Sequence, residues 1–258
     1  MYDDLACVRW NNGEVQCWGD ESEGLDWEGL RLQGELEVAR GVVCGLQTNG
    51  VPTCKTNIFD FGNLDTTNYV SIKPGDSSLC ALNLARGVEC PFVSPFVLPS
   101  FENLPEGPFN ALEVADGDYV CGLTDRDEWR CDGDIDFHRL PPENQFVKLS
   151  LGRGLHCGLE QEGTIRCWGT VLMGPIPRPE GTFIDLDMAA GFEGCGVNAE
   201  GGLDCWGRFA PDTSQAEGVV FRKVTVAIAT ACGIVGSDKV FCFGRRISQP
   251  PDDIAYVP

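Results

Sequence analysis

The chain has 258 residues, of which 43% are hydrophobic, and this is enough to bury a substantial core. Its 32 glycines and 16 prolines are typical of strands joined by turns rather than of long helices. The 39 acidic residues outnumber the 19 basic ones and give a formal charge of −20, so we expect no nucleic acid partner and no membrane insertion.

Fourteen cysteines mark a repeat along the chain. Each cysteine that opens a repeat is followed ten positions later by a second one, and successive opening cysteines are 36 to 41 residues apart. A period of about 37 residues that occurs seven times predicts one domain made of seven similar modules. The pairs are, in chain order, Cys7 and Cys17, Cys44 and Cys54, Cys80 and Cys90, Cys121 and Cys131, Cys157 and Cys167, Cys195 and Cys205, and Cys232 and Cys242.

The expected elements follow the same order in each repeat. An apolar strand, such as residues 183–188, comes first and a short turn follows it. Apolar residues recur two positions inside most of the cysteines, on either side of a polar tip that ends in glycine in four repeats, and this pattern predicts a β-hairpin. Leu159, Gly163 and Ile165 show this pattern. The hairpins are expected at residues 7–17, 44–54, 80–90, 121–131, 157–167, 195–205 and 232–242.

The hairpin register places the two cysteines of each pair opposite each other on one face of the sheet. We therefore expect seven disulfides, because this cross-strand geometry can supply the close pairing that they need. Buried free thiols and zinc ligands are the alternatives, but zinc knuckles place their cysteines two to four residues apart.

Disulfides in this number belong to an oxidising compartment. The amino terminus does not read as a signal peptide, so we expect an extracellular or periplasmic protein whose leader is not present in this chain, or part of a larger exported protein.

Three strands in every repeat predict an all-β fold. One open sheet of that size would leave two exposed edges, whereas a radial arrangement of small sheets removes most of this liability. We therefore predict that residues 1–258 form a single seven-bladed β-propeller with one disulfide in the hairpin of each blade. Residues 252–258 are expected to close the ring as a strand that pairs with the first blade.

Residues around the cysteines carry a family resemblance. From Cys157-Gly158-Leu159 to Cys167-Trp168-Gly169, an apolar strand is followed by a turn glycine and a terminal Trp-Gly. The pattern recurs around Cys195, and around Cys232 with Phe243-Gly244 in place of Trp-Gly. The pattern resembles the regulator of chromosome condensation repeat. Its cysteine-rich form is similar to exported bacterial propellers and to the crinkly repeats of plant receptor kinases. The resemblance implies a seven-bladed propeller along essentially the whole chain.

The resemblance also implies recognition of a protein partner by loops on one propeller face, without enzymatic activity. In related inhibitor propellers, the contacts come from the turn between the first strand and the hairpin. Filling of the rim or of the channel is the alternative role for side chains in these turns. The residues of the matching turns, which we expect to form the binding surface, are Arg40, Asp118, Tyr119, Arg153, His156, Phe192 and Glu193.

Two other functions stay open from the sequence. The first is a carbohydrate-binding or carbohydrate-active propeller, either a lectin or a glycosidase, although no particular pair of catalytic carboxylates stands out. The second is nucleotide exchange on a GTPase. It conflicts with the expected disulfides, because cytosolic and nuclear thiols stay reduced.

One acidic stretch is a candidate calcium site. Asp132, Asp134 and Asp136 alternate along the chain, and alternate carboxylates can supply the oxygen ligands that calcium takes in Asp-rich loops. A closing bidentate glutamate is not obvious, so a solvated hairpin end is the alternative. No other cofactor is expected.

The predicted ring closure can be tested by truncation. Deletion of residues 252–258 should sharply lower the melting temperature, because the first blade would lose the strand that pairs with its hairpin. Thermal unfolding followed by circular dichroism checks this result. An unchanged melting temperature would count against closure by this segment.

Overall fold

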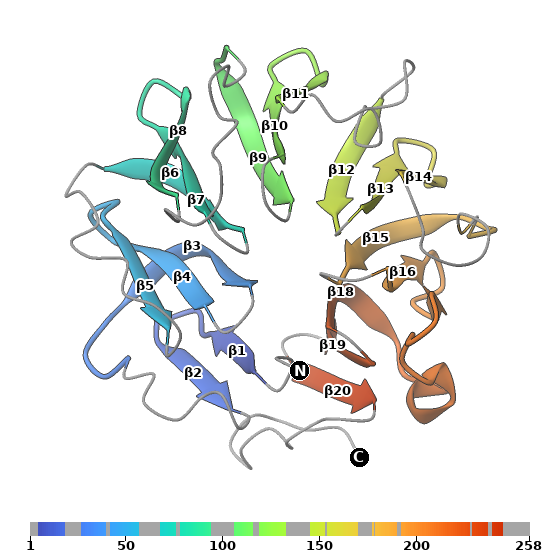
Figure 1. Ribbon diagram of the computed structural model, residues 1–258. Helices are drawn as coiled ribbons and strands as arrows, with labels where there is room; N and C mark the ends of the chain where they lie inside the picture. The colour runs from blue at the N-terminus through green and yellow to red at the C-terminus, as the bar shows by residue number, and fades with distance from the viewer. Residues whose placement is uncertain are drawn as a thin grey trace. The chain divides into compact units, whose positions relative to one another are not determined.

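The computed structural model describes most of the chain, and its strands group into two compact units, residues 1–134 and 135–258 (Figure 1). Each unit is considered by itself. The described residues are 5–18, 27–39, 42–56, 68–75, 78–93, 106–115, 119–132, 145–152, 154–169, 177, 179–189, 192–227, 229–236 and 239–244.

The first unit contains four antiparallel sheets that follow each other in chain order. The first of them has two described strands, and the other three have three strands each. Their strands are β1 (Ala6–Arg9) and β2 (Val15–Trp18); β3 (Leu32–Ala39), β4 (Val42–Gln47) and β5 (Pro52–Thr56); β6 (Tyr69–Pro74), β7 (Ser78–Asn83) and β8 (Val88–Val93); and β9 (Phe109–Ala115), β10 (Tyr119–Thr124) and β11 (Trp129–Asp132).

The second unit contains three sheets of three strands each. They are formed by β12 (Phe146–Leu151), β13 (Leu155–Glu160) and β14 (Ile165–Gly169); β15 (Phe183–Met188), β16 (Gly194–Asn198) and β17 (Leu203–Trp206); and β18 (Phe221–Ala227), β19 (Thr230–Val235) and β20 (Lys239–Gly244). A short 3-10 helix, η3 (Thr213–Ala216), lies between β17 and β18. Within the described segments, the structure has no helix that is long and apolar enough to cross a membrane.

All seven predicted disulfides are confirmed, and no cysteine is free. Each disulfide joins the two strands of one hairpin, and its two Cα atoms are 3.9–4.1 Å apart. Cys157 and Cys167, for example, are direct partners in the register of β13 and β14. The predicted order of one strand followed by a hairpin is confirmed in the six sheets that have three described strands. Residues 252–258, the predicted closing strand, lie outside the described residues.

A large side chain at the start of the first strand packs over the residue that follows the first cysteine. Phe146 of β12 covers Gly158 of β13, and a Cβ atom on this glycine would lie 2.4 Å from the Phe146 ring. Equivalent contacts join Leu32 to Gly45, Phe109 to Gly122, Phe183 to Gly196 and Phe221 to Gly233. These large residues are all buried. In these five sheets the residue after the first cysteine is glycine because the first strand approaches too closely for a side chain.

Backbone hydrogen bonds join the hairpin tip of one sheet to the start of the next sheet. The carbonyl of Gly163, the last tip residue of the β13–β14 hairpin, accepts the N–H of Phe183 at 2.8 Å. The same bond joins Gly13 to Leu32, Gly50 to Tyr69, Arg86 to Phe109 and Gly201 to Phe221. These tip residues have a left-handed backbone, as predicted for the glycines. Each of them therefore directs its carbonyl toward the neighbouring sheet.

The core of each unit lies between successive sheets. In the first unit, Leu46 and Cys44 of β4 pack with Tyr69 and Ile72 of β6. In the second unit, Val197 of β16 packs in a cluster with residues of the next sheet. Apolar burial between neighbouring sheets, rather than within one sheet, therefore holds each unit together.

Substitution of Gly158 by alanine tests the close approach of the first strand. We expect Gly158→Ala to lower the free energy of unfolding by about 2 kcal/mol, because the added methyl group overlaps the Phe146 ring. Ala81 occupies the equivalent position of the third sheet, so Ala81→Gly is the matched control and should cost about 1 kcal/mol or less. Urea unfolding of oxidised protein measures both values. Equal losses in the two variants would contradict the packing argument.

Candidate functional site

The predicted binding residues that the structure describes lie mainly in the core. Tyr119 begins β10 and is 3% exposed, His156 of β13 is 0% exposed, and Glu193 is 3% exposed. These three side chains are therefore buried rather than exposed, and their role in binding stays a prediction. Tyr119 and His156 belong to middle strands, which are covered on both edges by their own sheet. Arg40, Asp118 and Arg153 lie outside the described residues.

His156 forms part of an aromatic cluster. It is the cross-strand partner of Trp168, and the two ring centroids are 5.9 Å apart. Trp168 also stacks on Phe146, with 5.3 Å between the centroids and 12° between the ring planes. The buried His156 ring therefore packs against Trp168 of the neighbouring strand β14.

Glu193 fixes two segments of backbone. Its carboxylate accepts the N–H of Phe192 at 3.0 Å and the N–H of Phe209 at 3.3 Å. Phe192 is half-buried against the core cluster that contains Leu155 and Leu186. The predicted pair Phe192 and Glu193 thus anchors the loop that follows β17.

That loop presents an exposed aromatic residue that the sequence analysis did not single out. Phe209 is 50% exposed, and the guanidinium carbon of Arg208 lies 5.3 Å from the centroid of its ring. Further along the loop, Asp212 accepts the N–H of Ser214 and caps η3, and Gln215 accepts the N–H of Gly244 in β20. The position of Phe209, shortly after the Trp-Gly of its repeat, is the signal that could have identified it.

The predicted calcium site is largely outside the described residues. Asp132 ends β11, but its side chain is not described, and neither are Asp134 and Asp136. Among the residues that the structure does describe, no three or more His, Cys, Asp or Glu side chains are grouped to hold a metal ion. The calcium site therefore stays a prediction.

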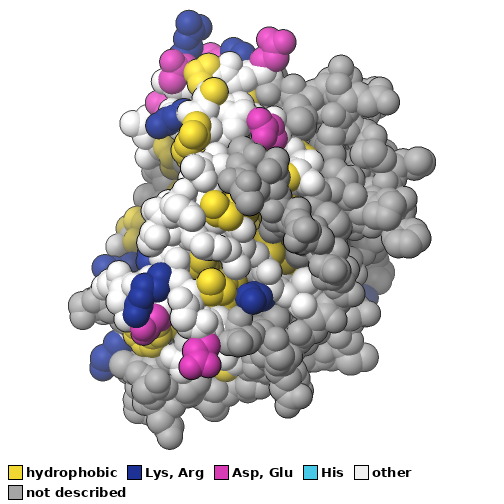
Figure 2. Space-filling view, turned by 90° about the vertical axis from the view of Figure 1, so that its left-hand side faces the viewer, with side chains coloured by type: hydrophobic (Ala, Val, Ile, Leu, Met, Phe, Trp, Pro, Cys, Tyr) yellow, Lys and Arg dark blue, Asp and Glu magenta, His cyan; other side chains and the backbone are white. Residues whose placement is uncertain are grey.

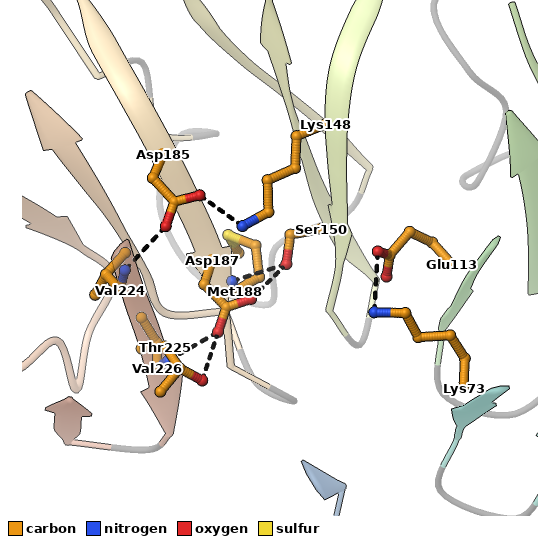
Figure 3. Close-up of polar contacts among 10 residues, drawn as sticks. All are labelled: Lys73, Glu113, Lys148, Ser150, Asp185, Asp187, Met188, Val224, Thr225 and Val226. Atoms are coloured by element: carbon orange, nitrogen blue, oxygen red, sulfur yellow. Dashed lines mark hydrogen bonds and ion pairs between the residues drawn. The ribbon is translucent and has the colours of Figure 1, made fainter. Parts of the chain in front are cut away.

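Lys73 joins three successive first strands in the first unit. Its ammonium group on β6 lies 3.0 Å from the Glu37 carboxylate on β3 and 3.3 Å from Glu113 on β9. Burial alone would lower the pKa of Lys73. Glu113 and Glu37 outweigh it, and the pKa is raised well above the ordinary lysine value. Figure 3 shows the contact with Glu113.

Asp185 joins three successive first strands in the second unit. One of its oxygens accepts a charge-assisted hydrogen bond from Lys148 of β12 at 2.7 Å, and the other accepts the N–H of Val224 in β18 at 2.9 Å (Figure 3). The Asp185 side chain is nearly buried. One carboxylate on β15 therefore links the strands on both sides of it.

Asp187 forms a second link, two residues further along β15. It accepts hydrogen bonds from the Ser150 hydroxyl at 3.0 Å, the Val226 N–H at 2.8 Å and the Thr225 hydroxyl at 3.2 Å. Burial raises the pKa of Asp187 above its ordinary value, and Lys148 and the hydrogen bonds from Val226 and Ser150 offset only part of this rise.

A sequence signal for these links exists, but it is visible only after the repeats are aligned. In each of the six sheets with three described strands, one residue of the first strand faces the first cysteine of the hairpin. These residues are polar or charged in every case: Glu37, Lys73, Glu113, Ser150, Asp187 and Thr225. The charges of Glu37, Lys73, Glu113 and Asp187 are thus used within the scaffold.

Figure 2 shows the side of the molecule that lies at the left of Figure 1. Among the described atoms of this side, hydrophobic side chains are scattered between basic and acidic ones, and no single kind gathers into a continuous patch.

Comparison with solved structures decides the fold. The crinkly ectodomain of the Arabidopsis thaliana receptor kinase ACR4 is 22% identical, with a TM-score of 0.72, and the match covers 94% of this chain and 92% of that one. The entire ectodomain of the Physcomitrella patens receptor kinase CR4 is 24% identical, with a TM-score of 0.76, over 94% of this chain and 71% of that one. The chain folds as a seven-bladed β-propeller.

The propeller also resembles Prp20p of Saccharomyces cerevisiae, with 12% identity and a TM-score of 0.62 over 80% of this chain and 70% of that one. Comparison of the sequence alone finds no relative. No protein-family model matches the chain, and no curated protein matches it. The predicted resemblance to crinkly and chromosome-condensation propellers is therefore confirmed at the level of structure.

Removal of Lys73 tests the polar link in the first unit. Lys73→Met leaves Glu37 and Glu113 facing each other without a cation, and we expect a loss of about 2 kcal/mol in the free energy of unfolding. Because the pKa of Lys73 is raised by folding, its contribution is complete below its unfolded value of about 10.5 and declines as the pH rises above it. Thermal unfolding at pH 8 and above pH 10.5 measures this dependence.

The control for this prediction is Lys239→Met, which removes an exposed lysine from β20. It should leave stability within about 0.5 kcal/mol of the parent. A triple variant that adds Glu37→Gln and Glu113→Gln to Lys73→Met should recover part of the loss, since no unpaired carboxylate remains. Equal effects of Lys73→Met and Lys239→Met would contradict the assignment.

Proposed function

We propose that this propeller is a non-enzymatic binding module of an extracellular or periplasmic compartment and that it recognises a protein partner. The seven disulfides carry the proposal. Cross-links of this number persist in oxidising compartments and are rare in the cytosol. They also hold each hairpin in one conformation before any partner arrives.

A preformed scaffold favours recognition by its loops. The tip of one sheet is fixed to the next by backbone hydrogen bonds, and Lys73, Asp185 and Asp187 fix neighbouring first strands within each unit. Hairpin tips held in this way lose little conformational entropy on binding. The charged groups of the first strands are already paired inside the scaffold, so the exposed loops are the parts that remain for a partner.

The structural neighbours bear on the proposal in two ways. Two of them are ectodomains of receptor kinases, which are presented outside the cell. Prp20p is described by its binding to Gsp1p and histones. We do not extend these partners to the present propeller, because its disulfides disfavour a reducing compartment.

The aromatic residues after the second cysteines give little support to a lectin. Trp18, Trp168 and Phe243 are buried, and Trp206 is half-buried against a core cluster. Stacking on a sugar ring requires an exposed aromatic face. Their packing inside the scaffold favours a protein partner over a glycan.

Capture under oxidising conditions tests the proposed function. The oxidised propeller and a reduced, alkylated control are immobilised, and each is exposed to secreted and envelope proteins of the source organism and to a glycan array. We expect one protein to bind only the oxidised form and to bind it again after purification. A glycan that binds with saturation, in the absence of any such protein, would overturn the proposal in favour of a carbohydrate-binding propeller.

A further inference from the structure

Irregularities at the start of the first strands expose side chains in the second unit. The pairing of β12 with β13 shifts register between Phe146 and Lys148, and that of β15 with β16 shifts between Phe183 and Asp185. The residues within these shifts, Val147 and Ile184, are 53% and 52% exposed. A bulge of this kind directs a side chain away from the sheet. In both strands the exposed side chain is aliphatic.

A third exposed aliphatic side chain belongs to the same end of the sheets. Val220 precedes β18 and is 61% exposed. This end is continuous from one sheet to the next, because each hairpin tip is bonded to the start of the following sheet. Phe183 donates its N–H to the carbonyl of Gly163, and Phe221 donates its N–H to the carbonyl of Gly201, each at 2.8 Å. We call Val147, Ile184, Val220 and the adjoining hairpin tips at residues 160–163 and 198–201 the tip surface of the second unit.

Acidic side chains accompany these aliphatic ones. Glu162 and Glu200 are exposed on the two hairpin tips, and Glu180 is exposed shortly before β15. Arg222 and Lys223 are the exposed basic residues at the start of β18. The three glutamates outnumber these two cations, and the whole chain has a formal charge of −20. A basic partner would therefore be attracted from a distance.

We propose that the tip surface of the second unit binds a protein segment that presents aliphatic or aromatic side chains flanked by Lys or Arg. This inference rests on the proposed function and specifies its surface and the chemistry of its partner. Apolar side chains provide the buried centre of such an interface and glutamates its polar rim. The hairpin tips are held by backbone hydrogen bonds, so the apolar side chains and the glutamates are positioned before the partner binds.

Peptide selection tests the proposal. The oxidised propeller is immobilised, and random twelve-residue peptides displayed on phage are selected against it. We expect enrichment of peptides that combine apolar residues with Lys or Arg. Synthetic copies of these peptides should bind at least tenfold more weakly to the Ile184→Thr, Val220→Thr double variant, and added salt should weaken their binding to the parent.

Phe209→Thr is the matched control, because Phe209 has similar exposure but follows β17 at the other end of its sheet. It should leave peptide affinity unchanged, and all variants should unfold at the temperature of the parent. Selected peptides that are acidic, or that lose affinity only with Phe209→Thr, would overturn the tip surface but leave the proposed function intact. Failure to select any peptide would overturn this inference, and the protein capture experiment would then decide separately whether the proposed function also fails.

Discussion

The pairing of two cysteines across each hairpin is the constraint on which the other features depend. Once Cys157 faces Cys167, the register of the whole hairpin is fixed, since a slip of one residue would move every side chain to the other face. The glycine after the first cysteine then lies beneath the large residue of the first strand. The tip glycine likewise comes into reach of the next sheet. Local cross-linking thus determines how successive sheets pack.

The hairpins, their disulfides and their left-handed tips could be predicted because they depend on residues close together in the sequence. The exposure of Tyr119, His156 and Glu193 could not, because it depends on what covers each side chain from neighbouring strands and loops. Position next to a turn indicates that a residue is near the end of a sheet, but it does not indicate the direction of its side chain. Glu193 shows this well, since its partners Phe192 and Phe209 belong to two different connections.

The links between first strands were missed for a related reason. Lys148, Asp185 and Val224 are separated by about one repeat each, and each looks like an ordinary polar or apolar residue of its own strand. Their meaning emerges only when equivalent positions of successive repeats are compared. The links also explain part of the acidic composition. Some of the carboxylates hold sheets together through buried hydrogen bonds, while others, such as Glu162 and Glu200, face the solvent.

The hydrogen bond between a hairpin tip and the next sheet uses only backbone atoms. Cys80 and Cys121 are 41 residues apart, the longest spacing in the chain, yet the Phe109 N–H still reaches the Arg86 carbonyl at 2.9 Å. The joint therefore tolerates different lengths of the connecting segment. A scaffold with such joints can accept insertions, deletions and exchange of whole repeats in its connections while its sheets stay docked, and this gives it wide scope to acquire new loops during evolution.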